Sequence, residues 1–241
     1  MQLYFIRHAQ STNNLLWEQT KASDGRSMDP ELTEKGWQQV QRLAMFLLEN
    51  QAPTPTATHN SQNGYGFGLT HIYTSLMVRA VATSSFVARA LDMPLYGWVD
   101  LHEEGGIYLH DPESGERVGQ PGKDQAYFST HYPELILPEG LAQDGWYNRP
   151  FETPEQCQER VIRFHNQLLL RHGDTADHVA VFSHGGFYNS YLRYLLGIQR
   201  ESDQLWLVLN NTAITRIDFR GDETIVVYLN RADFLPADLI S

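Results

Sequence analysis

The stretch Gln2-Leu3-Tyr4-Phe5-Ile6-Arg7-His8 decides the fold of this chain. Its first part, residues 2–6, is short and rich in leucine, tyrosine, phenylalanine and isoleucine, which is typical of a buried strand. The charge of Arg7 ends the apolar run, so Arg7 and His8 are expected at the carboxyl end of that strand. In open α/β sheets the functional crevice lies at the carboxyl ends of the parallel strands. Arg7 and His8 are therefore expected at that crevice.

Helix and strand patterns alternate along most of the remaining chain. Four segments show the apolar spacing of a helix: residues 36–49, 77–91, 154–171 and 186–196. Five further short apolar runs are typical of strands, the last two forming a hairpin: residues 69–74, 95–99, 179–182, 213–219 and 224–229. The segment between the first strand and residue 34 is a polar stretch. The pattern predicts an α/β fold, a three-layer α/β/α sandwich with a mostly parallel central sheet and an antiparallel edge.

The 241 residues are expected to form one domain, residues 1–241. Residues 51–68, rich in proline, threonine, glycine and asparagine, are interpreted as an exposed loop. Residues 100–150, approximately, carry many aromatic side chains with glycine and proline and are interpreted as a cap insertion. The cap follows a strand, so we expect it over the carboxyl ends of the strands. The loop precedes a strand, so we expect it at the opposite edge of the sheet, away from the substrate.

Charge and composition exclude some classes of partner. Lys+Arg 18 against Asp+Glu 29 gives a formal net charge of −11, which disfavours binding to nucleic acid or to an anionic membrane surface. A small phosphorylated substrate fits this charge only if the few cations converge on its phosphate. Cys157 is the single cysteine, and no apolar run reaches about 20 residues. The first residues lack a basic start and a long apolar stretch, so they are not expected to act as a signal peptide. A cytoplasmic protein is expected, with an oligomeric state that the sequence leaves open.

Three of the predicted strands are followed by arginine or histidine. Arg7 and His8 follow the first strand, Arg79 comes shortly after the second, and His184 follows the fourth. Parallel strands bring these side chains to one edge of the sheet. Guanidinium groups bind phosphate oxygens in pairs, and imidazoles can donate a hydrogen bond or attack phosphorus. Two glycines follow His184, and their backbone N–H groups at a helix start can approach the same anion. The sequence therefore predicts a phosphate site.

Several motifs, in order along nearly the whole chain, resemble those of the histidine phosphatase superfamily, which includes the cofactor-dependent phosphoglycerate mutases. The family's opening motif, R-H-G-[ED]-[ST]-x-x-N, is similar to Arg7-His8-Ala9-Gln10-Ser11-Thr12-Asn13-Asn14. The motifs L-T-x-x-G-x-x-Q, Y-[TS]-S-x-x-x-R, L-x-E, [ST]-H-G-G and N-x-[SA]-[IV]-T-x-[IL] match residues 32–39, 73–79, 101–103, 183–186 and 211–217. Ala9 replaces the usual glycine and Gln10 the usual acid. A slightly different loop geometry is expected, because alanine tolerates positive φ poorly.

The resemblance implies a metal-independent phosphatase of histidine acid type. Neutral His8 would attack the phosphorus of a monoester, and water would hydrolyse the resulting phosphohistidine. Two flanking arginines favour the neutral form of His8. The catalytic residues implied are His8, Glu103 as proton donor, His184, Arg7 and Arg79. The phosphate-binding residues implied are Arg7, Ser11, Asn14, Arg79 and His184.

Some assignments stay open. Glu104 stands beside Glu103 and is the other candidate for the proton donor. The cap cations Arg117, Lys123 and Arg149 are candidates for contacts with an acidic substrate. No cofactor is expected. No metal is expected either, because the remaining histidines show no metal-ligand spacing: His59, His71, His102, His110, His131, His165, His172 and His178.

Two other functions remain alternatives. Phosphoglycerate mutase-type phosphoryl transfer requires cations for a bisphosphorylated cofactor and a carboxylate. The mutases carry a basic stretch after the acid, where this chain reads Glu103-Glu104-Gly105-Gly106-Ile107-Tyr108 without a cation. The second alternative is a non-catalytic phosphate-binding module. Such a module usually lacks the nucleophile or the acid, and both are present here. A phosphatase is therefore the preferred reading of the sequence.

Overall fold

The computed structural model describes residues 1–51, 62–64, 66–198 and 205–241. Its centre is a seven-stranded sheet. Five neighbouring strands run parallel, in the order β6 (Leu135–Ile136), β3 (Leu95–Gly97), β2 (His71–Thr74), β7 (His178–Ser183) and β1 (Gln2–Arg7). Two antiparallel strands complete the sheet beside β1, namely β8 (Ile214–Arg220) and β9 (Glu223–Arg231). The prediction of a mostly parallel sheet with an antiparallel edge is confirmed.

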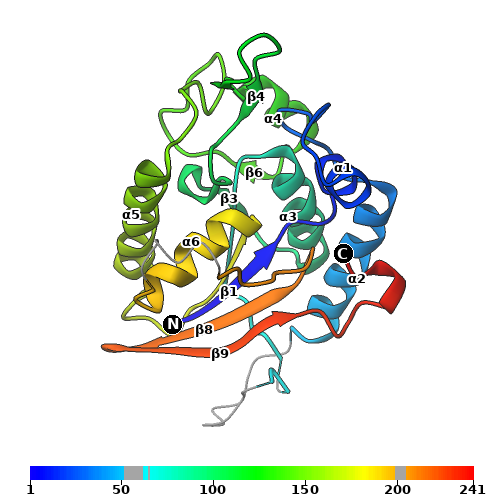
Figure 1. The fold of residues 1–241 in the computed structure, drawn as a ribbon. Coiled ribbons are helices and arrows are strands. Elements are labelled where there is room, and N and C mark those ends of the chain that lie inside the picture. The colour runs from blue at the N-terminus through cyan, green and yellow to red at the C-terminus, as the bar shows by residue number, and fades with distance from the viewer. Residues whose placement is uncertain (52–61, 65, 199–204) are drawn as a thin grey trace.

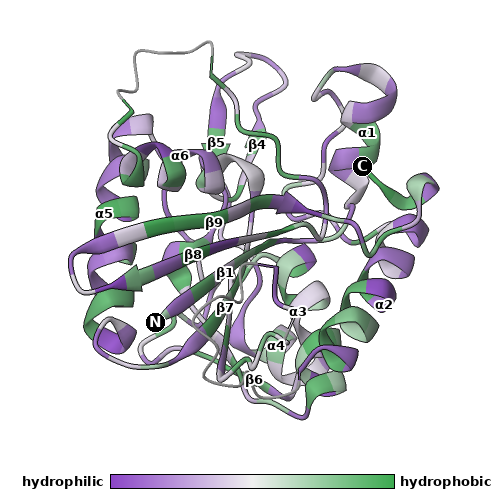
Figure 2. Cartoon of the chain, turned by 90° about the horizontal axis from the view of Figure 1, so that it is seen from below, coloured by the Kyte–Doolittle hydropathy of each residue, from purple (hydrophilic) through white to green (hydrophobic). Residues whose placement is uncertain are grey.

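Helices cover both faces of this sheet (Figure 1). On one face lie α5 (Pro154–His172) and α6 (Gly185–Leu195), and on the other lie α2 (Glu34–Glu49) and α3 (Val78–Leu91). Figure 2, seen from below, shows the strands running between these two helix layers. The predicted three-layer α/β/α arrangement is confirmed.

The alternation of side chains along β1 explains why the core has two halves. Leu3 and Phe5 point to one face and belong to a buried cluster with the apolar side chains of α5 and α6. Tyr4 and Ile6 point to the other face and belong to a cluster with α2 and α3. The four side chains are fully buried, so β1 is apolar on both faces, as a central parallel strand requires. The reactive side chains can therefore lie only at its end.

The polar stretch after β1 contains a helix that the sequence pattern did not indicate, α1 (Thr12–Thr20). No residue of α1 is buried, so it lacks the apolar stripe by which helices are recognised. A capping box specifies its start instead: the Ser11 hydroxyl accepts a hydrogen bond from the Asn14 backbone, and the Asn14 side chain accepts one from the Ser11 backbone.

Residues 100–150 begin at η1 (Val99–Leu101) and form more than a cap. They contain the hairpin of β4 (Tyr108–His110) and β5 (Arg117–Gly119), followed by α4 (Gln125–His131). Figure 1 places β4 and α4 beyond the carboxyl end of β1. The same segment also supplies β6, which extends the main sheet next to β3 and which the sequence reading did not predict.

The exposed loop expected at 51–68 lies largely outside the described residues, which omit 52–61 and 65. At its described end, Asn63 and Phe67 are buried, against the expectation of exposure. Phe67 is buried because it belongs to the core cluster that also contains side chains of α2 and α3. Asn63 is buried because its side chain donates to the Tyr4 hydroxyl at 2.8 Å and accepts from the Tyr228 hydroxyl at 2.8 Å.

The C-terminal residues are linked through Gln39 to the loop that follows β1. After β9 comes η2 (Ala237–Leu239), whose Leu239 carbonyl accepts a hydrogen bond from the Gln39 side chain at 2.7 Å. The Gln39 side-chain oxygen accepts in turn from the Gln10 backbone N–H at 2.7 Å. Residues far apart in sequence thus hold the backbone next to His8. Within the described part of the chain, no helix combines the length and the apolar character that crossing a membrane requires.

Candidate active site

His8 follows the last residue of β1 and is 2% exposed. Its Nδ1 lies 2.7 Å from the Ala9 carbonyl oxygen, so Nδ1 carries the proton of the neutral ring. That tautomer leaves the lone pair on Nε2, which accepts a hydrogen bond from Arg79 Nε at 3.1 Å. Burial, and then the charges of Arg79 and Arg7, hold the pKa of His8 well below its usual value. The arginines act as expected, but burial is the larger cause.

Arg79 lies in the first turn of α3 and is buried beside His8. Its Nη1 lies 3.8 Å from Oδ1 of Asp29, and the same oxygen accepts from the Val78 N–H at the start of α3 at 3.0 Å. Burial raises the pKa of Asp29 to about 6, although the charge of Arg79 opposes the rise. Asp29 therefore ties Arg79 to the helix start. It is a site residue that the sequence reading missed.

His184 follows β7 and is the N-cap residue of α6. Its ring centroid is 5.0 Å from that of His8, and its Nε2 lies 2.8 Å from the Ser75 hydroxyl. Its Nδ1 is buried without a hydrogen-bond partner in the described part of the chain. Burial, Arg79 and His8 hold the pKa of His184 well below its usual value. An orphaned buried nitrogen beside two arginines is suited to contact a phosphate oxygen.

Arg7, the last residue of β1, donates from Nη1 to the Leu209 carbonyl oxygen at 2.5 Å. Its Nε is a second buried atom for which residues 1–51, 62–64, 66–198 and 205–241 offer no hydrogen-bond partner. Burial lowers the pKa of Arg7 to about 10; the charge of Glu103 opposes this and that of Arg79 adds to it. The guanidinium remains charged at neutral pH, with a donor still to be satisfied.

Glu103 lies in the turn after η1. Its Oε1 accepts from the backbone N–H groups of Phe187 at 2.9 Å and Glu104 at 2.8 Å. The Phe187 N–H belongs to the first turn of α6, so the positive end of that helix holds the carboxylate. Gly186 makes this approach possible, because a Cβ there would lie 2.5 Å from Oε1. Glu103 also raises the pKa values of both site arginines, so it faces them across the site.

Arg160 in α5 holds the segment that carries Glu103. The buried Arg160 side chain donates from Nη1 to the carbonyl oxygens of Asp100 and His102, at 2.7 and 2.9 Å. Its Nε and Nη2 donate to the two carboxylate oxygens of Glu152 at 2.7 and 2.6 Å. The pair with Glu152 is bidentate and buried, and Arg160 thereby fixes the backbone that leads into the turn. A single arginine on a helix carries no sequence motif, so the sequence reading missed it.

Ser11 and Asn14, which the resemblance implies as phosphate ligands, are engaged with each other at the start of α1. The Ser11 hydroxyl donates to Asn14 Oδ1 at 3.0 Å, and the same oxygen accepts from the Asn211 side chain at 3.4 Å. The Asn14 oxygen is thus used in the cap. Its amide nitrogen is the atom that can donate to an anion.

Arg26 is a further arginine near the site, from the turn region after α1. Its guanidinium carbon lies 4.0 Å from the centroid of the Tyr108 ring, and its charge contributes to the lowered pKa of Arg79, of which burial is the largest cause. Its buried Nε also has no hydrogen-bond partner among the described residues. The sequence offered one signal, since Arg26 lies in the polar segment that leaves the carboxyl end of the first strand.

A cavity of about 720 Å³ opens at this edge of the sheet, and Arg7 and Glu103 form part of its wall. Four aromatic side chains line it: Trp17, Tyr108, Phe151 and Trp206. Trp17 is 56% and Trp206 62% exposed, so apolar surface is available at its rim. A neighbouring cavity of about 790 Å³ between α5 and α6 shares Glu104 and Trp206 with it; among the described residues, no histidine lines either cavity, and Arg7 and Glu103 belong to the wall of the first alone.

The three cap cations have different surroundings. Arg117 lines the 720 Å³ cavity, where its guanidinium carbon lies 4.8 Å from the Phe151 ring centroid. Lys123 lies over the Tyr127 ring at 4.5 Å, and Arg149 donates to the Tyr147 carbonyl oxygen at 3.1 Å. Of the three, Arg117 is the one in the cavity wall.

The two arginines next to His8 bear on which ligands the site can hold. The buried Arg79 and the partly buried Arg7 repel a metal ion, whereas they attract a phosphate. The backbone after His8 is not strained by the departures at Ala9 and Gln10, because neither adopts a positive φ. The Gln10 side-chain oxygen accepts from the Thr33 hydroxyl at 2.7 Å, and its nitrogen donates to Glu18 at 3.0 Å. Alanine at position 9 is therefore compatible with this backbone.

The chain is similar to known proteins over nearly its whole length. The sequence pattern of the histidine phosphatase superfamily (branch 1) matches residues 3–232. A candidate phosphoserine phosphatase of Hydrogenobacter thermophilus is 25% identical over 234 residues, 95% of this chain and 95% of that protein. A 5''-phosphoribostamycin phosphatase of Niallia circulans is 26% identical over 225 residues, 91% of this chain and 90% of that protein.

A solved structure is similar in fold. The phosphoserine phosphatase of Entamoeba histolytica, in complex with 3-phosphoglyceric acid, superposes with a TM-score of 0.60 at 19% identity. The superposition covers 98% of this chain and 99% of that one. The family match and the shared fold extend over nearly the entire chain. This chain belongs to the histidine phosphatase superfamily.

Proposed function

We propose that this protein hydrolyses phosphate monoesters through a covalent phosphohistidine on His8, with Glu103 as the proton donor. Membership in the superfamily supports hydrolysis of a phosphate ester. The observation that carries the mechanism is the orientation of the His8 ring. Its Nδ1–H group donates to the Ala9 carbonyl oxygen, and its Nε2 lone pair faces Arg79. A neutral, oriented imidazole whose lone pair faces cationic donors is the arrangement that a nucleophilic histidine requires.

In the first step Nε2 of His8 attacks phosphorus and the bond to the leaving oxygen breaks. Because Arg79 donates to the same nitrogen, the incoming phosphate must draw the guanidinium onto its own oxygens, which frees the lone pair. Arg7 Nε and His184 Nδ1 are buried donors that are still to be satisfied, and they suit the remaining phosphate oxygens. Charge stabilisation by fixed donors in a buried site is the main source of catalysis in phosphoryl transfer.

Glu103 delivers a proton to the leaving oxygen as the bond breaks. Its Oε1 accepts two backbone N–H groups, which leaves Oε2 as the oxygen that can carry the proton. In the second step Glu103 takes a proton from water, which attacks the phosphohistidine and releases inorganic phosphate. Glu104 lines the cavity as well, but Glu103 is the acid that interacts with both arginines.

The substrate is proposed to be a small phosphorylated molecule whose leaving group occupies the cavity of about 720 Å³. Its aromatic wall and the exposed tryptophans at its rim suit a leaving group with apolar or planar surface. Arg117 offers one cation for an acidic group. Relatives named for phosphoserine and for 5''-phosphoribostamycin support a small molecule, without selecting one.

Hydrolysis is preferred over mutase-type transfer because of the charges around this cavity. A mutase must hold two anionic groups beyond the transferred phosphate, whereas here the acids Glu104 and Glu152 share the cavity wall with Arg117. If 3-phosphoglycerate is isomerised efficiently without net phosphate release, the hydrolase proposal is wrong. A panel of phosphate esters ranked by kcat/KM identifies the substrate class.

The mechanism is tested by trapping the phosphoenzyme. Rapid quenching with a ³²P-labelled ester should give a labelled protein whose label is lost in acid and kept in base, as expected for phosphohistidine. The label should be absent from His8→Asn and unchanged in His110→Asn, a matched substitution of an exposed histidine. Initial rates should be unaffected by EDTA. Hydrolysis at the wild-type rate by His8→Asn would exclude both catalytic schemes, since hydrolase and mutase alike require His8 as the nucleophile.

A further inference from the structure

A second cluster of ionisable side chains lies at the amino ends of the parallel strands, whereas His8 lies at their carboxyl ends. His71 is the first residue of β2, His172 is the last residue of α5, and Asp177 directly precedes β7. In the sheet, His71 pairs with Val179 near the start of β7. The cluster is therefore at the amino ends of strands whose carboxyl ends lead to the active site.

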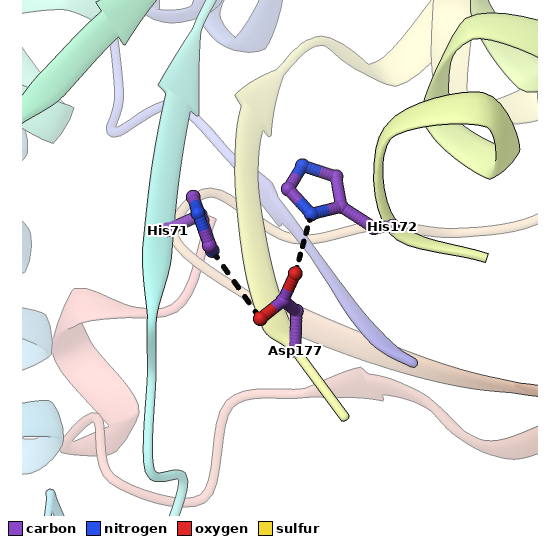
Figure 3. Close-up of side chains that lie close together, drawn as sticks. All are labelled: His71, His172 and Asp177. Carbon is purple, nitrogen blue, oxygen red and sulfur yellow. Dashed lines mark hydrogen bonds and ion pairs between the residues drawn. The ribbon is translucent and has the colours of Figure 1, made fainter. Parts of the chain in front are cut away.

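Figure 3 shows the Asp177 carboxylate between the two imidazole rings. Asp177 Oδ2 lies 2.8 Å from His172 Nδ1, and Oδ1 lies 3.9 Å from His71 Nδ1. The imidazole centroids are 4.6 Å apart and the rings are tilted by 59°. One ligand atom from each residue can be chosen so that all three lie within 4.8 Å of one another. Donor atoms around tetrahedral zinc are separated by about 3.3 Å, so small side-chain rotations would close the set.

His172 has the second hydrogen bond that a metal-binding histidine usually makes. Its Nε2 lies 3.0 Å from the Tyr73 hydroxyl, and the ring is buried. Without a metal, Nδ1 carries the proton, because the Asp177 carboxylate at 2.8 Å can only accept. With an ion bound, the proton would lie on Nε2 and be donated to Tyr73, which frees the Nδ1 lone pair for the ion. Metal-ligating histidines are oriented in this way by a partner on the other ring nitrogen.

His71 can release its Nδ1 lone pair without leaving a hydroxyl unsatisfied. The Thr70 hydroxyl lies 2.9 Å from that nitrogen, and it also lies 3.2 Å from the His178 carbonyl oxygen, to which it can donate instead.

We propose that His71, His172 and Asp177 bind one divalent transition-metal ion, zinc by preference. Two imidazoles and one carboxylate are a nitrogen and oxygen donor set that suits zinc, with water in the fourth position. The ion would tie the end of α5 to the starts of β2 and β7. It takes no part in the reaction at His8, because the whole length of β7 separates the two sites. The sequence spacing gave no sign of this set, since His71 in β2 is distant in sequence from the connection between α5 and β7 that holds His172 and Asp177.

The test uses the full, tag-free chain with ZnCl₂ or CoCl₂. One equivalent should bind tightly, the cobalt complex should show the intense visible bands of a four-coordinate ion, and zinc should raise Tm. His71→Ala and Asp177→Asn should each abolish the tight equivalent. Tyr73→Phe, which removes the hydroxyl beside His172, should weaken binding by about 10- to 100-fold. His131→Ala, a substitution of an exposed histidine in α4, should bind as the wild type does.

Phosphatase rates separate this proposal from the proposed function. Initial rates of His71→Ala should equal those of the wild type, with and without EDTA, while the rise of Tm with zinc is lost. Equal zinc binding by wild type, His71→Ala and Asp177→Asn would overturn the proposal. So would a wild-type cobalt complex with only the weak bands of a six-coordinate ion. If His71→Ala does not fold, Asp177→Asn decides, because an amide can still accept the hydrogen bond from His172.

Discussion

Arg79 Nε donates a hydrogen bond to His8 Nε2 over 3.1 Å. The same guanidinium therefore occupies the lone pair of Nε2 and lowers the pKa of the ring. Oδ1 of Asp29 lies 3.8 Å from Nη1 of Arg79, and this ion pair helps to hold the guanidinium in place. Both groups are buried, so the interaction is felt at low dielectric and little screened by salt. The proposed chemistry depends on this pair more than on any other contact, which makes it the first target for substitution.

Replacing His8 by asparagine should lower kcat by about 10⁴-fold or more, because the covalent route is lost. Steady-state hydrolysis of a small aryl phosphate measures this loss. Thermal unfolding of the same variant checks that it folds. The exposed His110→Asn variant is the control and should keep full activity. A loss of less than tenfold in His8→Asn would contradict a nucleophilic role.

Replacing Arg79 by lysine and by glutamine separates charge from geometry. Lysine keeps a cation near His8 but loses the fork that binds two oxygens, so kcat/KM should fall by about 10²- to 10³-fold with little change in its acid limb. Glutamine removes the charge as well, so the pKa of His8 should rise and the acid limb should move to higher pH. Titration of the His8 ring by NMR reports the shift directly. Identical His8 titrations in both variants would show that the Arg79 charge is not a cause.

The parts of this site that could be predicted from the sequence are those carried by local pattern. Arg7, His8 and His184 follow apolar runs that had to be buried strands, so their convergence followed from the parallel sheet. Helix α1 could not be predicted because none of its residues is fully buried and its start depends on two side-chain hydrogen bonds. Strand β6 has only two residues, and its pairing with β3 forms only in the folded chain.

The supporting residues were missed for a different reason. Asp29 and Arg160 act through contacts with Val78, Asp100 and His102, which are distant in sequence. No periodicity or motif encodes such pairs, and a buried arginine on an amphipathic helix resembles a surface one until its partner is known. Sequence thus indicated the groups proposed to touch phosphate, while the structure was needed for the groups that hold them.

The pH dependence of stability should reflect three buried histidines. Burial, as the largest cause, holds the pKa values of His8, His102 and His184 well below normal. The unfolded chain therefore binds more protons than the folded one below about pH 6.5. In that range each histidine lowers the free energy of unfolding by about 1.4 kcal/mol per pH unit until its folded pKa is reached.

Asp29 acts in the opposite sense, since its folded pKa of about 6 lies above that of the unfolded chain. It adds stability as the pH falls through 6, but it is one group against three histidines. Urea unfolding at pH 7.5, 6.0 and 5.0 should show a net loss of stability toward acid. His110→Asn should leave this loss unchanged. A free energy of unfolding that rises from pH 6.5 to pH 5 would contradict the neutral, buried state of these rings.

Replacing Glu103 by glutamine should affect substrates according to their leaving group. An alkyl phosphate needs protonation of its leaving oxygen, so kcat/KM should fall by about 10²- to 10⁴-fold. A p-nitrophenyl ester has a stable leaving anion and should lose far less. Glu104→Gln is the matched control and should behave as the wild type with both substrates. The opposite result, with Glu104→Gln selective for the alkyl ester, would transfer the proton-donor role to Glu104.

Replacing Gly186 by alanine should displace the carboxylate of the proposed acid, Glu103, while leaving residue 103 itself unsubstituted. A Cβ at Gly186 would lie 2.5 Å from Glu103 Oε1, so the carboxylate must leave its place on the start of α6. The obstructed atom is the end of a flexible side chain, so the protein should fold, while alkyl phosphate hydrolysis falls by up to about 10²-fold through misplacement of the acid. Gly185→Ala is the neighbouring control, since its Cβ would meet Arg7 Nε at an ordinary 3.7 Å. Comparable kcat/KM values for the two variants, with unchanged Tm, would mean that the bond between Glu103 and α6 does not position the proton donor.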